Sequence, residues 1–396
     1  MVNDGIGEPS DGKLKPIVDA AQSSDLAIDE IAFLAAKLGK SGETIKFDAG
    51  GLVADLASSG GPTSLSTILT PFYLVSLGFK VPKLGVPGRP AGGIDVFAQL
   101  PGFLIDPEPV RVREIVGNCG FSHFKAGDKY APCDAKLFKY RQKVGAQDVP
   151  DLVIASLLAK KIAVGVENVG LDIRVAPFGN LGSDYEAARS NAERFNAVAD
   201  SLGLKSTCFL TDSRTPYQPY IGRGEALLAL RKVVEGQADP WLENHANECW
   251  EMASNLAELG GLPVSKERPG IHGILRLHLE AQGTSWSKFL EKTDKVINGH
   301  RSQLVAETNG YLKIDIERVR DVFVRENGVT HEREVFPDRI GVILSASTNQ
   351  RVSEGDTIAT LRFREDQSGA LAKELSKIIS VGEQGGEKID LERIVG

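Results

Sequence analysis

The feature that most constrains the fold is a strand, a glycine-rich turn, a helix and a second strand that follow one another early in the chain. The apolar segment GLVADL (residues 51–56) indicates a strand, and the turn ASSGGPTS (residues 57–64) leads into the helical segment LSTILTPFYLVSL. The next segment, FKVPKLG (residues 79–85), indicates a second strand. Because two strands joined by a helix lie parallel with a right-handed crossover, this unit predicts a parallel sheet flanked by helices.

Helices and strands continue to alternate through the middle of the chain. Helical patterns cover residues 15–22, 26–38, 151–164 and 184–202, and strands are expected at residues 169–175 and 205–212. After residue 284, short strands separated by Gly, Asn and Asp turns indicate a small β-containing C-terminal domain. A chain of 396 residues is also too long for a single core. The expected fold class is therefore α/β, with a mostly parallel sheet and more than one domain.

Composition and charge exclude several classes of protein. The formal net charge is −7 and the pI is 5.6, whereas a protein that mainly binds nucleic acid needs a basic face. No apolar run reaches the roughly 20 residues that span a bilayer, and the N-terminus shows no signal-peptide pattern. We therefore expect no nucleic-acid or membrane partner and a cytoplasmic location. Four cysteines without a CxxC pair and six histidines without an HExxH motif predict no bound metal.

Three segments carry motifs in a fixed order. Residues 55–103 contain an Asp, a Ser-x-Gly-Gly turn, a Ser/Thr-rich helix, a Gly-Arg loop and a Pro-Gly-Phe. Residues 130–165 contain A-P-x-D, an Arg and A-S-x-L-A-K-K, and residues 171–212 continue with a strand, a helix and a strand. Together these segments resemble the pyrimidine nucleoside phosphorylase family, which includes thymidine phosphorylase. Weaker similarity extends the resemblance over residues 50–365.

The resemblance implies a division into three units. A small all-α lobe would comprise residues 1–48 and 133–163, and a larger α/β lobe with a mostly parallel sheet would comprise residues 49–132 and 164–284. Residues 285–396 would form the C-terminal α+β domain. The active site is expected in the cleft between the two lobes. Members of the family dimerise through the α lobe, so a homodimer is expected, although the N-terminal segment is shorter here.

The resemblance assigns recognition of the nucleobase to Arg141, Ser156 and Lys160, with Arg141 and Lys160 also expected to be catalytic. Ser156 and Lys160 lie four residues apart on one predicted helix and therefore project from the same face. A pyrimidine leaving group gains negative charge as its glycosidic bond breaks, and two cations with a hydroxyl would stabilise that charge. A planar guanidinium suits a carbonyl edge. The competing interpretation is that Lys160 and Lys161 belong to a solvated helix face.

The resemblance also assigns a phosphate- and sugar-binding set. Its members are Ser58, Ser59, Gly60, Gly61, Ser66, Thr67 and Arg89. The glycines allow backbone amides to approach an anion, and the turn precedes the start of a helix. The competing interpretation is a tight strand-to-helix turn without a ligand.

This second site departs from the family pattern. The family turn Asp-Lys-His-Ser-Thr-Gly-Gly is replaced by the segment DLASSGG, which places Leu56 and Ala57 where the lysine and the histidine are expected. The second loop, GRPAGG (residues 88–93), has no counterpart of the family's threonine donor. Each lost hydrogen bond to an ionised partner is worth about 1.5–3 kcal/mol. Lys83 and Arg89 are close enough in sequence to compensate.

Three functions remain open at this stage. The first is a phosphorylase that cleaves a pyrimidine nucleoside with phosphate, and the second is a nucleoside hydrolase or another glycosyl transferase. The third is a catalytically inactive protein that binds a nucleoside. Each predicts a small-molecule nucleoside or nucleobase as partner and no cofactor, with inorganic phosphate as the candidate co-substrate of the first. Elsewhere, Asp134, Asp172 and Asp212 are expected to cap helices or to pair with cations, and His123 is expected to be an ordinary packed or surface histidine.

Overall fold

The computed structural model describes most of the chain. The described residues are 11–47, 52–89, 92–328, 336–363, 368–383 and 392–395. Gly51, at the start of the first expected strand, and Pro90 and Ala91, in the expected second loop, lie outside them.

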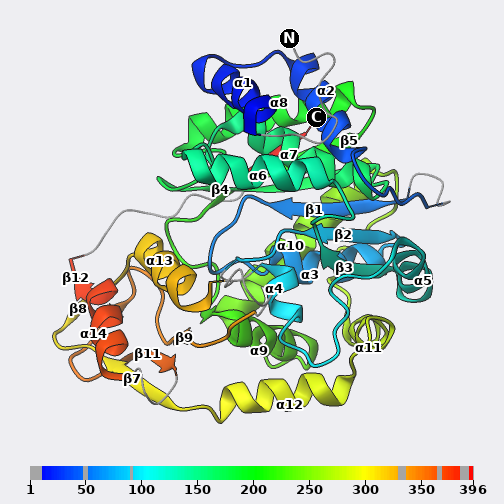
Figure 1. Cartoon of the computed structure of the whole chain (residues 1–396). Helices are drawn as coiled ribbons and strands as arrows, with labels where there is room; N and C mark the ends of the chain where they lie inside the picture. Colours follow the sequence, from blue (N-terminus) through cyan, green and yellow to red (C-terminus); the bar gives the residue numbers. More distant parts are fainter. Residues whose placement is uncertain are drawn as a thin grey trace.

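A mostly parallel sheet crosses the middle of the molecule (Figure 1). Strands β1 (Ala54–Ser58), β4 (Asn168–Val175) and β5 (Lys205–Asp212) are parallel neighbours in that order. Strands β2 (Val81–Gly85) and β3 (Phe121–Lys125) form a second parallel pair, which a parallel bridge between Val53 and Lys80 joins to β1. The sequence of β1, helix α3 (Ser66–Ser76) and β2 thus confirms the predicted parallel βαβ unit. The expected α/β fold class is confirmed.

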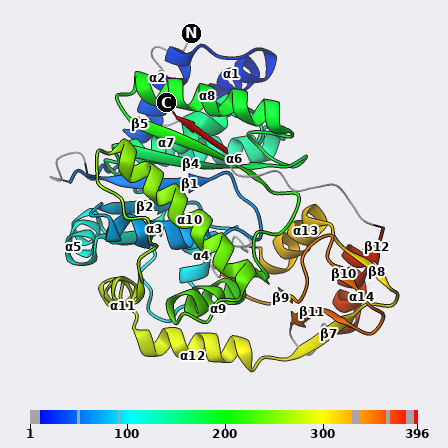
Figure 2. The same cartoon turned by 180° about the vertical axis from the view of Figure 1, so that it is seen from behind.

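Helices cover both faces of this sheet (Figure 2). The face toward the N-terminal helices carries α1 (Asp11–Ser23), α2 (Ile28–Gly39), α6 (Pro132–Val144), α7 (Pro150–Ala163) and α8 (Tyr185–Ser201). The opposite side carries α3, α4 (Gly93–Phe97), α9 (Arg223–Val234), α10 (Pro240–Leu259), α11 (His272–Ala281) and α12 (Trp286–Ile297). Helix α5 (Pro109–Cys119) packs against β2 and β3. The result is three layers, with the sheet in the middle.

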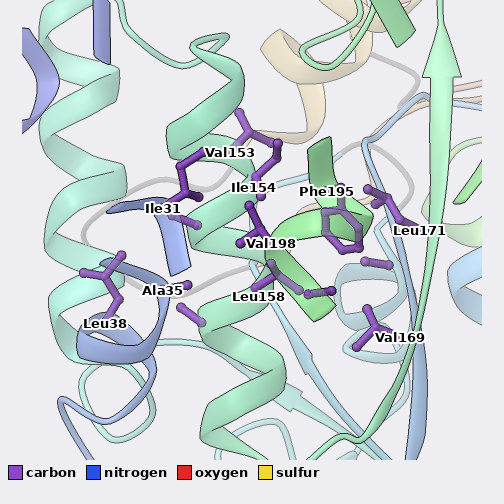
Figure 3. Close-up of a cluster of buried hydrophobic side chains, with 14 of the residues drawn as sticks. Ile31, Ala35, Leu38, Val153, Ile154, Leu158, Val169, Leu171, Phe195 and Val198 are labelled. Carbon is purple, nitrogen blue, oxygen red and sulfur yellow. The ribbon is translucent and has the colours of Figure 1, made fainter. Parts of the chain in front are cut away.

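The core above the sheet is continuous with the N-terminal helices. Ile31 of α2, Leu158 of α7 and Phe195 of α8 meet Leu171 of β4 in one buried cluster (Figure 3). Helix α7 is apolar on nearly all sides because it is covered by α2, α6 and α8. The helices of the expected all-α lobe therefore share a core with the sheet.

The C-terminal domain has its own core and two small antiparallel sheets. Its elements are β7 (Arg301–Val305), β8 (Gly310–Ile314), α13 (Ile316–Asn327), β9 (Gly341–Leu344), β10 (Arg351–Val352), β11 (Thr357–Arg362), α14 (Ser368–Ile378) and β12 (Ile379–Gly382). One sheet has the order β10-β8-β12, and the other has the order β6-β9-β11-β7, in which β6 (Tyr220–Ile221) comes from the α/β lobe.

Two elements that follow residue 285 pack with the α/β lobe and not with the C-terminal elements. Helix α12 packs on α9, and its Phe289 and Val296 belong to the core below the main sheet. Strand β13 (Glu392–Val395) pairs antiparallel with β5, so the chain returns to the main sheet. Within the described residues, no helix is long and apolar enough to cross a membrane.

Candidate functional site

The main sheet has a topological switch point between β1 and β4. From β1 the chain passes through α3 to β2 on one side, and from β4 it passes through α8 to β5 on the other. Helices α3 and α8 belong to the cores on opposite faces of the sheet (Figure 1). In open α/β sheets, ligands bind at the carboxyl ends of the strands at such a point. The predicted phosphate turn begins there, at the end of β1.

The backbone of this turn requires glycine. Gly60 and Gly61 have φ angles of 114° and 127°, which side-chain-bearing residues rarely adopt. The Ser58 hydroxyl accepts a hydrogen bond from the Gly60 amide at 3.3 Å. The Ser59 hydroxyl accepts one from the Arg174 amide at 2.8 Å, which ties the turn to β4.

A buried arginine organises the predicted serines. The Arg174 guanidinium donates to the hydroxyls of Ser58 at 3.4 Å and Ser66 at 3.1 Å. It also donates to Thr211 at 3.1 Å and lies 4.1 Å from the centre of the Tyr217 ring. Ser58 and Ser66, from opposite ends of the turn, are thus brought together around one cation.

Asp172 neutralises this cation and binds the same hydroxyls. Its carboxylate pairs with Arg174 and accepts hydrogen bonds from Ser66 at 2.6 Å and Thr211 at 2.9 Å. Burial opposes the charge on Arg174, but Asp172 and Tyr217 together more than offset this and the pKa of the guanidinium is raised. Asp172 and Arg174 thus hold the hydroxyls of Ser66 and Thr211 between them.

Sequence reasoning missed Arg174 as a site residue. The signal was present, because an aspartate and an arginine two residues apart interrupt the otherwise apolar strand β4 near its carboxyl end. Two residues at this spacing point to the same face of a strand. Two opposite charges at this spacing in an apolar strand could therefore have identified Asp172 and Arg174 as a buried pair.

The two remaining predicted phosphate residues, Thr67 and Arg89, lie outside the hydrogen bonds of the Arg174 cluster. Thr67 is half-buried on the first turn of α3. Arg89 follows β2, and its guanidinium lies 5.6 Å from the ring of Phe138 on α6. Arg89 therefore contacts the helix pair that carries the predicted base residues.

Two of the three predicted base residues form one hydrogen-bonded unit. The Lys160 ammonium lies 2.8 Å from the Ser156 hydroxyl and 2.6 Å from the Asp134 carboxylate of α6. Burial lowers the pKa of Lys160, and Asp134 opposes that shift. Lys160 is 6% exposed and Lys161 is 3% exposed, so the alternative of a solvated helix face is wrong.

Arg141 belongs to the same helix pair but faces the backbone. Its guanidinium donates to the carbonyls of Ala146 at 2.9 Å, Gln147 at 2.6 Å and Leu152 at 3.1 Å. These bonds close the connection between α6 and α7. Burial lowers the pKa of Arg141 to about 10. Arg141 was expected to contact the nucleobase, whereas in this conformation its guanidinium binds these three backbone carbonyls.

A buried triad links the helix pair to β1. Lys161 of α7 and Lys83 of β2 donate to opposite oxygens of Asp55, at 2.5 Å and 2.7 Å. Lys83 also donates to the Leu56 carbonyl at 2.5 Å. Burial opposes ionisation of Asp55, but the two lysines more than offset it, so its pKa is lowered. The Lys83 ammonium thus reaches from β2 to β1, the strand in which Leu56 replaces the family's lysine. The Leu56 side chain itself is buried against Phe209 and Met252.

The buried charges on these elements balance. Five cationic side chains (Lys83, Arg141, Lys160, Lys161 and Arg174) accompany five carboxylates (Asp55, Asp134, Asp151, Asp172 and Asp212). Burial in this region is therefore tolerated because each sign is matched by the other.

The other sequence expectations concern single residues. Asp134, Asp172 and Asp212 each pair with a cation, as expected. His123 is a packed histidine, 1% exposed, with its ring 6.1 Å from Phe97, and burial lowers its pKa well below the usual value. No group of three potential metal-ligating side chains occurs in the described part of the chain.

Comparison with known proteins adds independent information. No family model matches the chain. It is 25% identical over 404 residues to a thymidine phosphorylase of Sinorhizobium medicae, with 96% of this chain and 90% of the relative covered. It is also 25% identical over 376 residues to an AMP phosphorylase of Methanococcus maripaludis, with 88% and 69% covered. A solved anthranilate phosphoribosyltransferase from Thermus thermophilus aligns with a TM-score of 0.46 and 13% identity, over 73% of this chain and 95% of that one.

Both relatives are named phosphorylases, and they support a transferase as the class of the protein. Within that class, the chain is a divergent homologue of the thymidine phosphorylases and AMP phosphorylases, and the resemblance inferred from the motifs is confirmed.

Proposed function

We propose that the protein is a pentosyltransferase that cleaves the N-glycosidic bond of a pyrimidine nucleoside with inorganic phosphate. The products are the free base and a sugar 1-phosphate. The observation that carries this proposal is the Ser58, Ser66 and Arg174 cluster at the switch point, beside the glycine turn that follows β1. A hydroxyl-rich turn at the carboxyl end of a parallel strand suits a sugar and a phosphate.

The phosphate end of the reaction uses the turn after β1. The Gly60 and Gly61 backbone lies at the end of a parallel strand just before α3, where amides and hydroxyls can hold an anion. Arg174 fixes the serine hydroxyls, and Asp172 balances its charge. Lys83 supplies a charge near the position where Leu56 replaces the family's lysine.

The base end of the reaction uses α7. An oxygen of phosphate bonds to the anomeric carbon as the bond from that carbon to the base nitrogen breaks, and the electron pair stays with the base. The base therefore gains negative charge. Lys160 donates to the hydroxyl and the carbonyl of Ser156 and to Asp134, so a direct hydrogen bond to the base requires the exchange of one of these three bonds. Without that exchange, its charge would stabilise the leaving base through space.

The relatives leave two candidate substrate classes. Thymidine phosphorylases favour a pyrimidine nucleoside, while AMP phosphorylases favour a nucleoside monophosphate. The Ser156–Lys160 unit matches the pyrimidine-binding motif, so we propose a pyrimidine nucleoside.

One observation favours a second function, a phosphate-independent nucleoside hydrolase. Leu56 faces the core and Ala57 carries no donor, so the strand itself offers phosphate no charged side chain. A neutral nucleophile such as water would tolerate such a site.

The test is base release from uridine, thymidine, cytidine and AMP, followed by chromatography with and without phosphate. The proposal predicts release from a pyrimidine nucleoside only with phosphate. Release in phosphate-free buffer would support the hydrolase. Binding of a nucleoside without release under either condition would leave a catalytically inactive binding protein, and release from AMP alone would change the substrate class.

A further inference from the structure

The segment that carries Arg89 is held by a buried carboxylate. Asp95 of α4 accepts hydrogen bonds from the Gly88 amide at 2.7 Å and the Arg89 amide at 3.2 Å. Asp95 is fully buried. Gly88 has a φ of 94°, and a Cβ at Gly92 would lie 2.8 Å from an Asp95 oxygen. The tight path of this segment therefore depends on glycine and on Asp95.

A buried arginine holds the same residue from its other side. Arg223, at the start of α9, donates to the Arg89 carbonyl at 3.1 Å and 3.4 Å and to Asp95 at 3.1 Å. The amide of Arg89 is thus fixed by Asp95 and its carbonyl by Arg223. Both side chains are completely buried.

The C-terminal domain supports this arrangement. Arg223 donates to the Pro337 carbonyl at 2.6 Å, and Gln99 donates to the Phe336 carbonyl at 2.9 Å. Asp338, the next residue, accepts from the Gly224 amide at 3.1 Å and pairs with Arg362 of β11. Residues 336–338 therefore connect the C-terminal domain to the backbone of Arg89.

As a result, the backbone of Arg89 is fixed by hydrogen bonds while its side chain is exposed. The Arg89 side chain is exposed and lies over Phe138 of α6, and its charge acts on Arg141. Its backbone is held by Asp95, which binds the amide, and by Arg223, which binds the carbonyl.

We propose that Asp95 and Arg223 are positioning residues that hold Arg89 at the edge of the substrate site, with the C-terminal domain bracing them through Pro337. This inference rests on the proposed function and extends it by giving Arg89 the phosphate-binding role that the sequence resemblance assigns to it. Arg223 and Asp95 act through Arg89, so their loss weakens phosphate binding while the chemistry at saturating phosphate is retained.

The first arm of the test is kinetic. Arg223→Lys keeps the charge but loses the planar fork. It is expected to raise KM for phosphate about tenfold to a hundredfold, as for lost charged hydrogen bonds, while KM for the nucleoside is unchanged and kcat stays within about threefold. Arg231→Gln is the matched control, because Arg231 lies on the same helix and pairs with Glu235 and Asp294. In an Arg89→Ala background, Arg223→Lys should have no additional effect.

The second arm does not depend on activity. Amide hydrogen exchange at Gly88 and Arg89 should be at least about tenfold faster in Asp95→Asn and Arg223→Lys than in the wild type, with Arg231→Gln unchanged. Unchanged exchange in both variants would overturn the proposal. Faster exchange with an unaltered phosphate KM, or an additional loss in the Arg89→Ala background, would also overturn it. If the wild type shows no phosphorolysis, the proposed function fails and the exchange arm alone decides whether Asp95 and Arg223 hold this segment.

Discussion

Lys160 and Asp134 join α7 to α6 through an ion pair of 2.6 Å that is almost entirely buried. The pair holds the ammonium beside the Ser156 hydroxyl. Burial lowers the pKa of Lys160, and Asp134 opposes that shift. Asp134 therefore favours the charged form of Lys160, which is the form that the proposed reaction uses to stabilise a base leaving as an anion.

Replacing Lys160 by Met should lower kcat/KM for the nucleoside about a hundredfold to a thousandfold, the range for losing one donor to a developing charge. Lys143→Met is the control, because Lys143 lies on α6 and forms an exposed pair with Asp11. Steady-state kinetics at saturating phosphate provides the measurement. Equal rates in the two variants would remove Lys160 from the site.

Replacing Arg174 by Lys should disperse the serine cluster while leaving a charge for Asp172. A lysine lacks the fork that reaches Ser58, Ser66 and Thr211 together. We expect KM for phosphate to rise about tenfold to a hundredfold. Arg214→Lys, in which an exposed arginine that pairs with the buried Asp212 is replaced, should leave KM unchanged. An unaltered phosphate KM in Arg174→Lys would mean that phosphate binds elsewhere.

Replacing Asp55 by Asn should reduce the free energy of unfolding by about 3–5 kcal/mol, because Lys83 and Lys161 would remain buried without a carboxylate. Urea denaturation at neutral pH is the measurement, and Asp11→Asn at the surface should have almost no effect. The pKa of Asp55 is lowered in the folded protein, so its contribution is present above the unfolded pKa and is lost as the pH falls through the folded pKa. The two curves should therefore converge in acid.

Asp95 should have the opposite pH dependence. Burial raises its pKa to about 6, against the opposing effects of Arg223, the Gly88 and Arg89 amides and the Arg89 charge. A carboxyl group with a raised folded pKa stabilises the fold below its unfolded pKa, and this contribution is lost as the pH rises through about 6. Between about pH 4 and pH 7, the wild type should lose stability relative to Asp95→Asn, by on the order of 2 kcal/mol. A constant difference across this range would show that Asp95 keeps an ordinary pKa.

Local sequence patterns predicted most of the sheet and its neighbours. The bounds of β5 match the expected residues 205–212, and α7 and α8 differ from the expected helices by a single residue at each end. These elements follow from apolar periodicity and from their turns, as at the α8 N-cap Asp184. The Ser156–Lys160 contact also followed from sequence, because helical spacing alone brings the two together.

Contacts between segments that are distant in sequence could not be predicted from local patterns. The pairing of β13 with β5 and the packing of α12 on α9 depend on where the chain returns in space. The ion pairs of Lys83 with Asp55 and of Arg223 with Asp95 join separate elements, and sequence spacing carries no signal for either. Arg141 lies on α6, the helix that precedes Ser156 and Lys160, but its guanidinium donates to nearby backbone carbonyls.

The most direct test of the account is phosphorus NMR of the purified protein with thymidine or uridine and inorganic phosphate. If the protein is a phosphorylase, a sugar 1-phosphate signal appears at the expense of inorganic phosphate, in equal amount to the free base, and this signal is strongly reduced in Arg174→Lys at low phosphate. Free base without a phosphorus-containing product, or no reaction of either nucleoside, would contradict the central claim that this chain transfers a pentose to phosphate.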